Sequence, residues 1–114
     1  MTAMPMQIPL RNLPHDMTVR VPNHEAAYGG EYLDPVEIRH VRFERTEALN
    51  PRAYALADGA QGRIWIDAAN SEGAFEVPKG SKIDVLGRAE GMQAASCTAY
   101  EIAGRMHHWE VDVK

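Results

Sequence analysis

Two adjacent histidines, His107 and His108, stand in the stretch RMHHWEVD, and histidine pairs are common metal ligands. Successive side chains of a β-strand point to opposite faces. The alternation of this stretch therefore predicts that the two imidazoles cannot bind one ion together. Cys97, His15 and His24 could each join one of the histidines, but none of them has metal-ligand spacing. We expect no metal site, with His107 at the edge of the core and His108 facing solvent or a partner.

Glu110 and Asp112 share one face of the same predicted strand, and two neighbouring carboxyl groups can perform general acid–base catalysis. A regularly alternating strand produces the same pattern, so we interpret them as a polar edge that is solvated or faces a partner. Cys97 lies among small residues without a neighbouring base, which favours an inert thiol. Nucleotide-binding glycine motifs and a nucleophile elbow are both missing. The sequence therefore predicts neither catalytic residues nor a cofactor.

The composition is that of an ordinary soluble domain. The chain has 114 residues, of which 45% are hydrophobic and 25% charged, and its formal net charge is −4. No run of about 18 apolar residues is present that could span a membrane. The acidic charge opposes the phosphate neutralisation on which nucleic-acid affinity depends. Trp65 and Trp109 are closely followed by acidic residues rather than interleaved with lysine and arginine, so we expect core or protein-contact tryptophans.

Period-two alternation predicts several short strands, the first in the stretch DMTVRVP, which Pro22 ends. Residues 36–46 are predicted as one long, bent strand whose phase slips near Arg39 and His40, as a β-bulge would produce. Further strands are expected at 63–67, at 82–85, in one or two weaker segments between 92 and 102, and at 106–113. About six strands separated by turn residues predict an all-β fold, a small antiparallel barrel or sandwich.

The remaining segments set the organisation of the chain. Residues 1–15 contain three prolines and are expected to form an extended arm ahead of a single domain over 16–114. Residues 47–62 are rich in alanine and broken by Asn-Pro and Asp-Gly pairs, so we expect a long loop with a short helical turn over 52–57. The predicted core contains Val41, Phe43, Ile64, Ile66, Trp109, Val111 and Val113.

Four stretches in this order, VRFERT, IWIDAANS, VPKGSKIDVLG and MHHWEVDV, resemble the minor capsid protein family of tailed bacteriophages and prophages. The resemblance covers residues 16–114. Its most specific part is the strand ending in IDAANS, followed by a G-S-K turn and the HHWEV strand. Members of that family are similar to head-completion or stopper proteins, small β-barrels that assemble as a ring beneath the portal and adaptor proteins. The resemblance implies a structural virion protein without catalysis, which closes the DNA channel after packaging and provides the tail attachment surface.

The same resemblance implies that the loop 47–62 projects towards the central channel. The channel-loop residues would be Asn50, Pro51, Arg52, Tyr54, Leu56 and Asp58. The implied partners are further copies of the chain in a ring, the portal and adaptor proteins, tail-side proteins, and double-stranded DNA that passes without specific binding. The implied location is the head–tail interface of the virion, and the bacterial cytoplasm during assembly. A ring of acidic subunits would repel phosphates, so DNA could slide through it.

Aromatic residues and arginine dominate protein interfaces, and exposed polar positions are open to partners, which makes five side chains candidates for contacts in the ring. They are Tyr28, Tyr32, Arg42, Arg45 and His108. Two other functions also fit the sequence. A tail terminator or another tail-side ring protein would have a similar small β-rich fold. A small barrel could also bind single-stranded nucleic acid.

Overall fold

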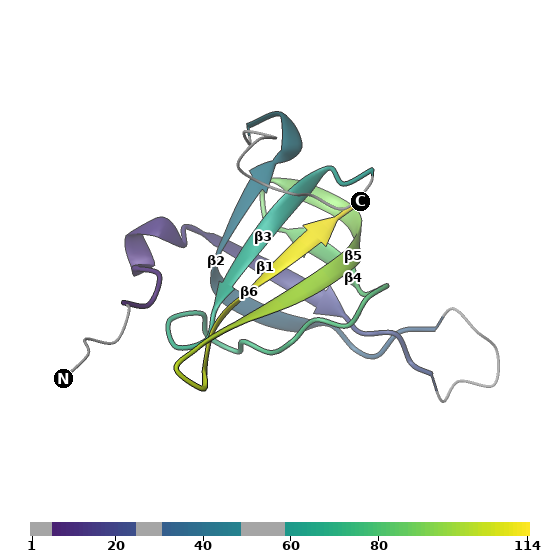
Figure 1. The fold of residues 1–114 in the computed structure, drawn as a ribbon. Coiled ribbons are helices and arrows are strands. Elements are labelled where there is room, and N and C mark those ends of the chain that lie inside the picture. The colour runs from purple at the N-terminus through teal and green to yellow at the C-terminus, as the bar shows by residue number, and fades with distance from the viewer. Residues whose placement is uncertain (1–5, 25–30, 49–58) are drawn as a thin grey trace.

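The computed structural model describes residues 6–24, 31–48 and 59–114. The strands are β1 (His15–Arg20), β2 (Val36–Arg45), β3 (Gly62–Asp67), β4 (Lys82–Val85), β5 (Ala89–Ile102) and β6 (Arg105–Val113), and two short 3-10 helices are η1 (Leu10–Asn12) and η2 (Thr46–Ala48). The strands close into an antiparallel barrel in the order β1-β2-β3-β6-β5-β4 (Figure 1). This architecture confirms the predicted all-β fold and selects the barrel over the sandwich. Among the described residues, no helix has the length and apolar character needed to cross a membrane.

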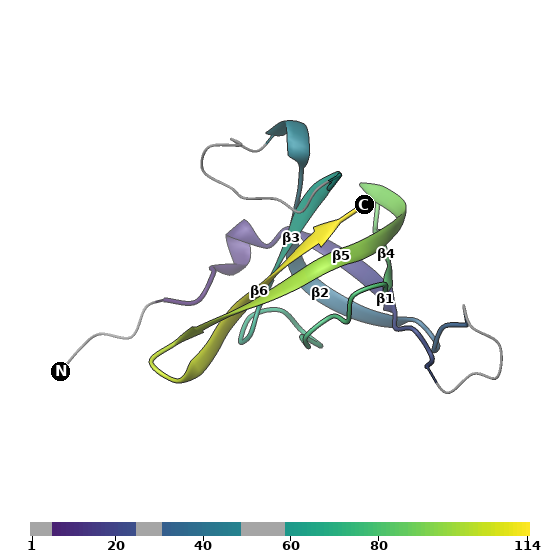
Figure 2. The same cartoon turned by 45° about the vertical axis from the view of Figure 1, so that its right-hand side comes forward.

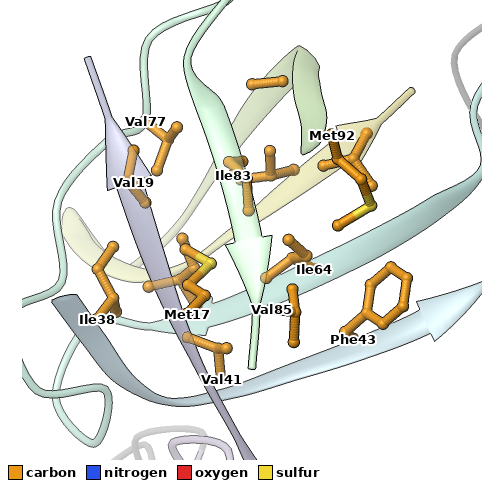
Figure 3. Close-up of a cluster of buried hydrophobic side chains, with 14 residues drawn as sticks. Met17, Val19, Ile38, Val41, Phe43, Ile64, Val77, Ile83, Val85 and Met92 are labelled. Atoms are coloured by element: carbon orange, nitrogen blue, oxygen red, sulfur yellow. The ribbon is translucent and has the colours of Figure 1, made fainter. Parts of the chain in front are cut away.

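The interior of the barrel is filled by the side chains that alternation assigned to it. Val41, Phe43, Ile64, Ile66, Val111 and Val113 are all buried, as predicted. Trp109 is half-buried and packs against this cluster. Figure 3 shows the contributions of β1 and β4, where Met17 pairs with Val85 and Val19 with Ile83. Each such side chain contributes about 1.5–3 kcal/mol through removal from water, so this cluster is the main source of stability.

β2 bends at His40, close to where the sequence predicted a slip in phase. The pairing of β2 with β1 shifts by one residue there, so the β-bulge is confirmed. His40 has a φ of 62°, in the left-handed region, and its backbone N–H donates to Asp16 Oδ1 at 3.1 Å. The extra residue places both Ile38 and Val41 in the core, although their sequence positions have opposite parity.

β5 is one continuous strand of 14 residues, where the sequence indicated one or two weaker segments. Its first part pairs with β4 and the remainder with β6. A two-residue turn joins it to β6, in which Ala103 and Gly104 have φ of 52° and 78°, as a tight hairpin turn requires. Both views show this hairpin extending beyond the other strands (Figures 1 and 2). Residues 98–101 are exposed at every position, so they carry no alternation for a sequence pattern to detect.

The described part of the N-terminal segment lies against the turn that follows β3. Ile8 N–H donates to Asp67 Oδ1 at 2.9 Å, and Asn70 Nδ2 donates to Ile8 O at 2.8 Å. Asp67 is 0% exposed, and its other carboxylate oxygen accepts the backbone N–H groups of Ala69 and Asn70. One buried carboxylate therefore fixes both the turn after β3 and the segment ahead of β1.

The backbone at His40 can be tested by substitution. His40→Gly should keep the free energy of unfolding within about 1 kcal/mol of the wild type, because glycine adopts positive φ without a steric penalty. His40→Val should lower it by about 1–3 kcal/mol, because a β-branched side chain is disfavoured there. Urea unfolding followed by circular dichroism measures both. Equal losses in the two variants would mean that the imidazole, and not the backbone conformation, matters at this position.

Candidate functional site

The two ends of the loop 47–62 are joined where they leave the barrel. Thr46 N–H donates to Gln61 O at 2.8 Å, and Thr46 Oγ1 donates to Ala60 O at 2.6 Å. Gln61 N–H donates to Val113 O at 2.7 Å, which ties the same base to β6. The predicted helical turn 52–57, Tyr28 and the channel-loop residues Asn50, Pro51, Arg52, Tyr54, Leu56 and Asp58 lie outside the described residues. The barrel thus holds this loop on a closed, hydrogen-bonded base.

The four described interface candidates do not form one patch. Arg42 and Arg45 are exposed and lie in the last four residues of β2. The Arg42 guanidinium lies 5.7 Å from the ring centroid of Trp65, which it partly covers. Tyr32 is half-buried and precedes the other end of β2, while His108 is half-buried on β6. Contacts through all four would therefore need partners at more than one face of the barrel.

The expected polar edge of β6 is not solvated. Arg63 of β3 stands opposite Asp112 of β6 in the strand register, and its Nε donates to Asp112 Oδ1 at 2.6 Å. Arg63 Nη1 donates to Glu110 Oε1 at 2.9 Å. The hydrogen bond with Asp112 raises the pKa of Arg63, and the three side chains are only 9%, 6% and 13% exposed. Of the two alternatives expected for this edge, solvated or facing a partner, the solvated one was wrong because a guanidinium from the neighbouring strand shares this face.

The two histidine rings are in contact, which the alternation of β6 did not predict. The register of β6 against β5 shifts at His107, so the alternation breaks at that residue. As a result, His107 Nδ1 lies 2.8 Å from His108 Nδ1. The other ring nitrogens are also occupied, since His107 Nε2 lies 2.9 Å from Met6 O and His108 Nε2 lies 2.9 Å from Glu110 Oε2. The prediction that the imidazoles point to opposite faces was therefore wrong.

The hydrogen bonds of the two imidazoles form a continuous series from Met6 O through His107 and His108 to Glu110. The Met6 carbonyl and the Glu110 carboxylate beside Arg63 accept hydrogen bonds, so both Nε2 atoms carry hydrogen. The Nδ1–Nδ1 contact links the two rings, so the hydrogen-bonded series runs from the N-terminal segment to Glu110 of β6. Within the described residues no group of three or more His, Cys, Asp or Glu is arranged to hold a metal ion.

His15, at the start of β1, is held by the backbone of β2. Its Nδ1 accepts the N–H of Phe43 at 3.0 Å, which places the hydrogen of the neutral ring on Nε2. Burial, followed by the positive charge of Arg88, lowers the pKa of His15 below its ordinary value of 6.5. The folded protein therefore favours the neutral imidazole at this position.

The ion cluster around Arg63 predicts a large loss on substitution. Arg63→Met should lower the free energy of unfolding by about 3–5 kcal/mol, because it leaves two buried carboxylates without their cation. Adding Asp112→Leu should recover part of the loss by removing one of those charges. The matched control is Arg39→Met, which breaks an ion pair with Glu37 that is about half exposed and should cost less than about 1 kcal/mol. Similar losses for both arginines in chemical unfolding would contradict the assignment.

His15 predicts a component of the pH dependence of stability. The unfolded chain binds a proton near pH 6.5, whereas the folded chain does so at lower pH, so this contribution is complete above 6.5 and is lost as the pH falls below it. His15→Asn removes the titrating ring, and its side-chain oxygen can still accept the Phe43 N–H. The variant should lose less stability than the wild type between about pH 7 and pH 5. An identical slope in the two proteins would rule out this role.

Comparison with known proteins gives no match, whether the chain is compared with family models, with curated proteins or with solved structures. The residues of the chain are therefore the basis for a functional assignment.

Proposed function

We propose that this chain is a structural subunit of the head–tail connector of a tailed bacteriophage, a head-completion or stopper ring protein. In this role it closes the DNA channel after packaging and provides the attachment surface for the tail. The resemblance of VRFERT, IWIDAANS, VPKGSKIDVLG and MHHWEVDV to the minor capsid family supports the assignment. Its partners are further copies of itself, the portal and adaptor proteins, and proteins on the tail side.

The hydrogen-bonded base of the loop 47–62 is the observation that carries the proposal. A loop that closes a channel must be long enough to reach the channel axis, and a rigid scaffold must hold its two ends in place. The bonds of Thr46 to Gln61 and Ala60, and of Gln61 to Val113, join both ends of the loop to the barrel. A ring with this end turned inward would place one such loop per subunit at the channel.

The rival reading as a single-stranded nucleic-acid binder has less support. Such barrels combine exposed aromatic rings with a groove of uncompensated basic residues. Here the Trp65 ring has the Arg42 guanidinium 5.7 Å from its centroid, and Arg63 on the same strand is bound by two carboxylates. The formal net charge of −4 also opposes phosphate binding.

Electron microscopy of lysates tests the proposed function directly. The gene is interrupted in the phage or prophage that carries it, and filled heads, empty heads and unattached tails are counted. Abundant free tails beside heads that have packaged and then lost their DNA are the expected result. Expression of the intact gene from a plasmid is the control and should restore tailed, filled particles.

Two other outcomes have distinct meanings. Filled, closed heads beside tails of uncontrolled length would replace the head-completion role with that of a tail-side ring. Normal numbers of tailed, infectious particles without the gene would reject a connector role of either kind.

A further inference from the structure

A cavity of about 420 Å³ opens at the loop end of the barrel. It lies between the start of β1, the end of β2 with η2, and the turn from β4 to β5. Its lining residues are Pro14, His15, Phe43, Glu44, Arg45, Glu47 and Arg88. Figure 1 places the end of β2 and the C-terminus at this same end of the barrel. The volume is within the range of about 300–1,000 Å³ that small-ligand sites occupy.

Two arginines, Arg45 and Arg88, line this cavity, and neither forms an ion pair with a carboxylate among the described residues. Arg45 Nη2 donates to the backbone carbonyl of Arg88 at 2.8 Å, so the side chain from β2 reaches the turn before β5. The Arg45 guanidinium also lies 5.6 Å from the ring centroid of Phe43, which helps to fix its position. In the described part of the chain, the ion pairs of Arg39, Arg42 and Arg63 include neither Arg45 nor Arg88. Most of their N–H donors are therefore available to a ligand.

His15 adds a neutral donor to the same lining. Its Nδ1 is occupied by the Phe43 N–H, so the hydrogen of the neutral ring is on Nε2. Burial and then the positive charge of Arg88 lower the pKa of His15, while the Glu44 carboxylate of the same lining raises it. The pocket thus combines two cations with a neutral N–H donor.

The described lining also holds two carboxylates, Glu44 and Glu47. Glu44 is engaged by Arg42, whose Nε lies 3.2 Å from Glu44 Oε1. Glu47 is exposed on η2, so it is the remaining anion against Arg45 and Arg88. Counted with Arg42, three arginines stand against two carboxylates among the described residues, an excess of one positive charge in a chain whose formal net charge is −4. Arginine side chains with unused donors are the usual recognition elements for carboxylate and phosphate groups.

We propose that this cavity is an oxyanion-binding site, in which Arg45 and Arg88 hold a carboxylate or phosphate group and His15 Nε2–H supplies a further hydrogen bond. The inference is independent of the connector role, because it depends only on the cavity and its charges. A carboxylate would come from a small organic acid or from an acidic side chain of a partner. A phosphate would come from a free or esterified phosphate group.

NMR titration of the full chain tests the proposal, with inorganic phosphate and glutarate as separate probes at constant ionic strength. At least one probe should give saturable shifts of the His15 ring and Arg45 Nε signals. The pKa of His15 should rise on saturation, because a bound anion favours the imidazolium. Arg45→Gln and Arg88→Gln should each weaken binding by about tenfold or more, the effect of losing one strong charge-assisted contact.

The control variant is Arg105→Gln, an exposed arginine at the start of β6 that is not part of the cavity lining. It should bind the probe like the wild type. Saturation by phosphate alone or glutarate alone would support the site and identify the source of its ligand. The proposal would be overturned if neither probe gave saturable shifts. It would also be overturned if Arg105→Gln weakened binding as much as Arg45→Gln and Arg88→Gln do. Arg88 is exposed in a turn, so Arg88→Gln should fold normally. This variant therefore tests the site even if Arg45→Gln folds poorly.

Discussion

Closure of the six strands into a barrel is the constraint on which the other features of the structure depend. Each strand must pair on both sides while the sheet twists and bends. Regular registers cannot be kept along every strand of such a closed sheet, so the pairing shifts by a residue at some positions. The register shifts at His40 of β2, at Ala95 of β5 and at His107 of β6. Such shifts also turn side chains to new directions. The one in β2 completes the core, and the one in β6 brings two histidine rings together.

Closure also explains the buried charges on the outer face. β3 and β6 are neighbours in the barrel, and their register sets Arg63 opposite Asp112, with Glu110 in reach. A slip of one residue would turn Arg63 towards the apolar interior and leave both carboxylates without their cation. Because the penalty for an unpaired buried charge is large, the cluster penalises alternative registers even if its net contribution to stability is small. Charge pairing and apolar alternation therefore specify the same arrangement of these two strands.

Alternation in the sequence was sufficient to predict the fold class, the barrel or sandwich alternative and most of the core. It located the bulge in β2 because two apolar pairs of opposite parity flank His40. It could not locate the bulge at His107, because no apolar pair marks the change of phase there. The neutralisation of Asp112 was also hidden, since Arg63 is 49 residues away and only the barrel makes them neighbours. Burial raises the pKa of Cys97, which agrees with the inert thiol that its small neighbours suggested.

The charges at the loop end connect the cavity with the proposed channel. The chain as a whole carries a formal charge of −4, but this end holds Arg45 and Arg88, which form no ion pair within the described residues. In a ring whose loops face the channel, two uncompensated arginines per subunit would attract DNA phosphates and oppose sliding. An oxyanion in the cavity would reduce this positive charge. If a neighbouring connector protein supplies the anion as a carboxylate, the contact that assembles the ring also sets the charge that DNA meets in the channel.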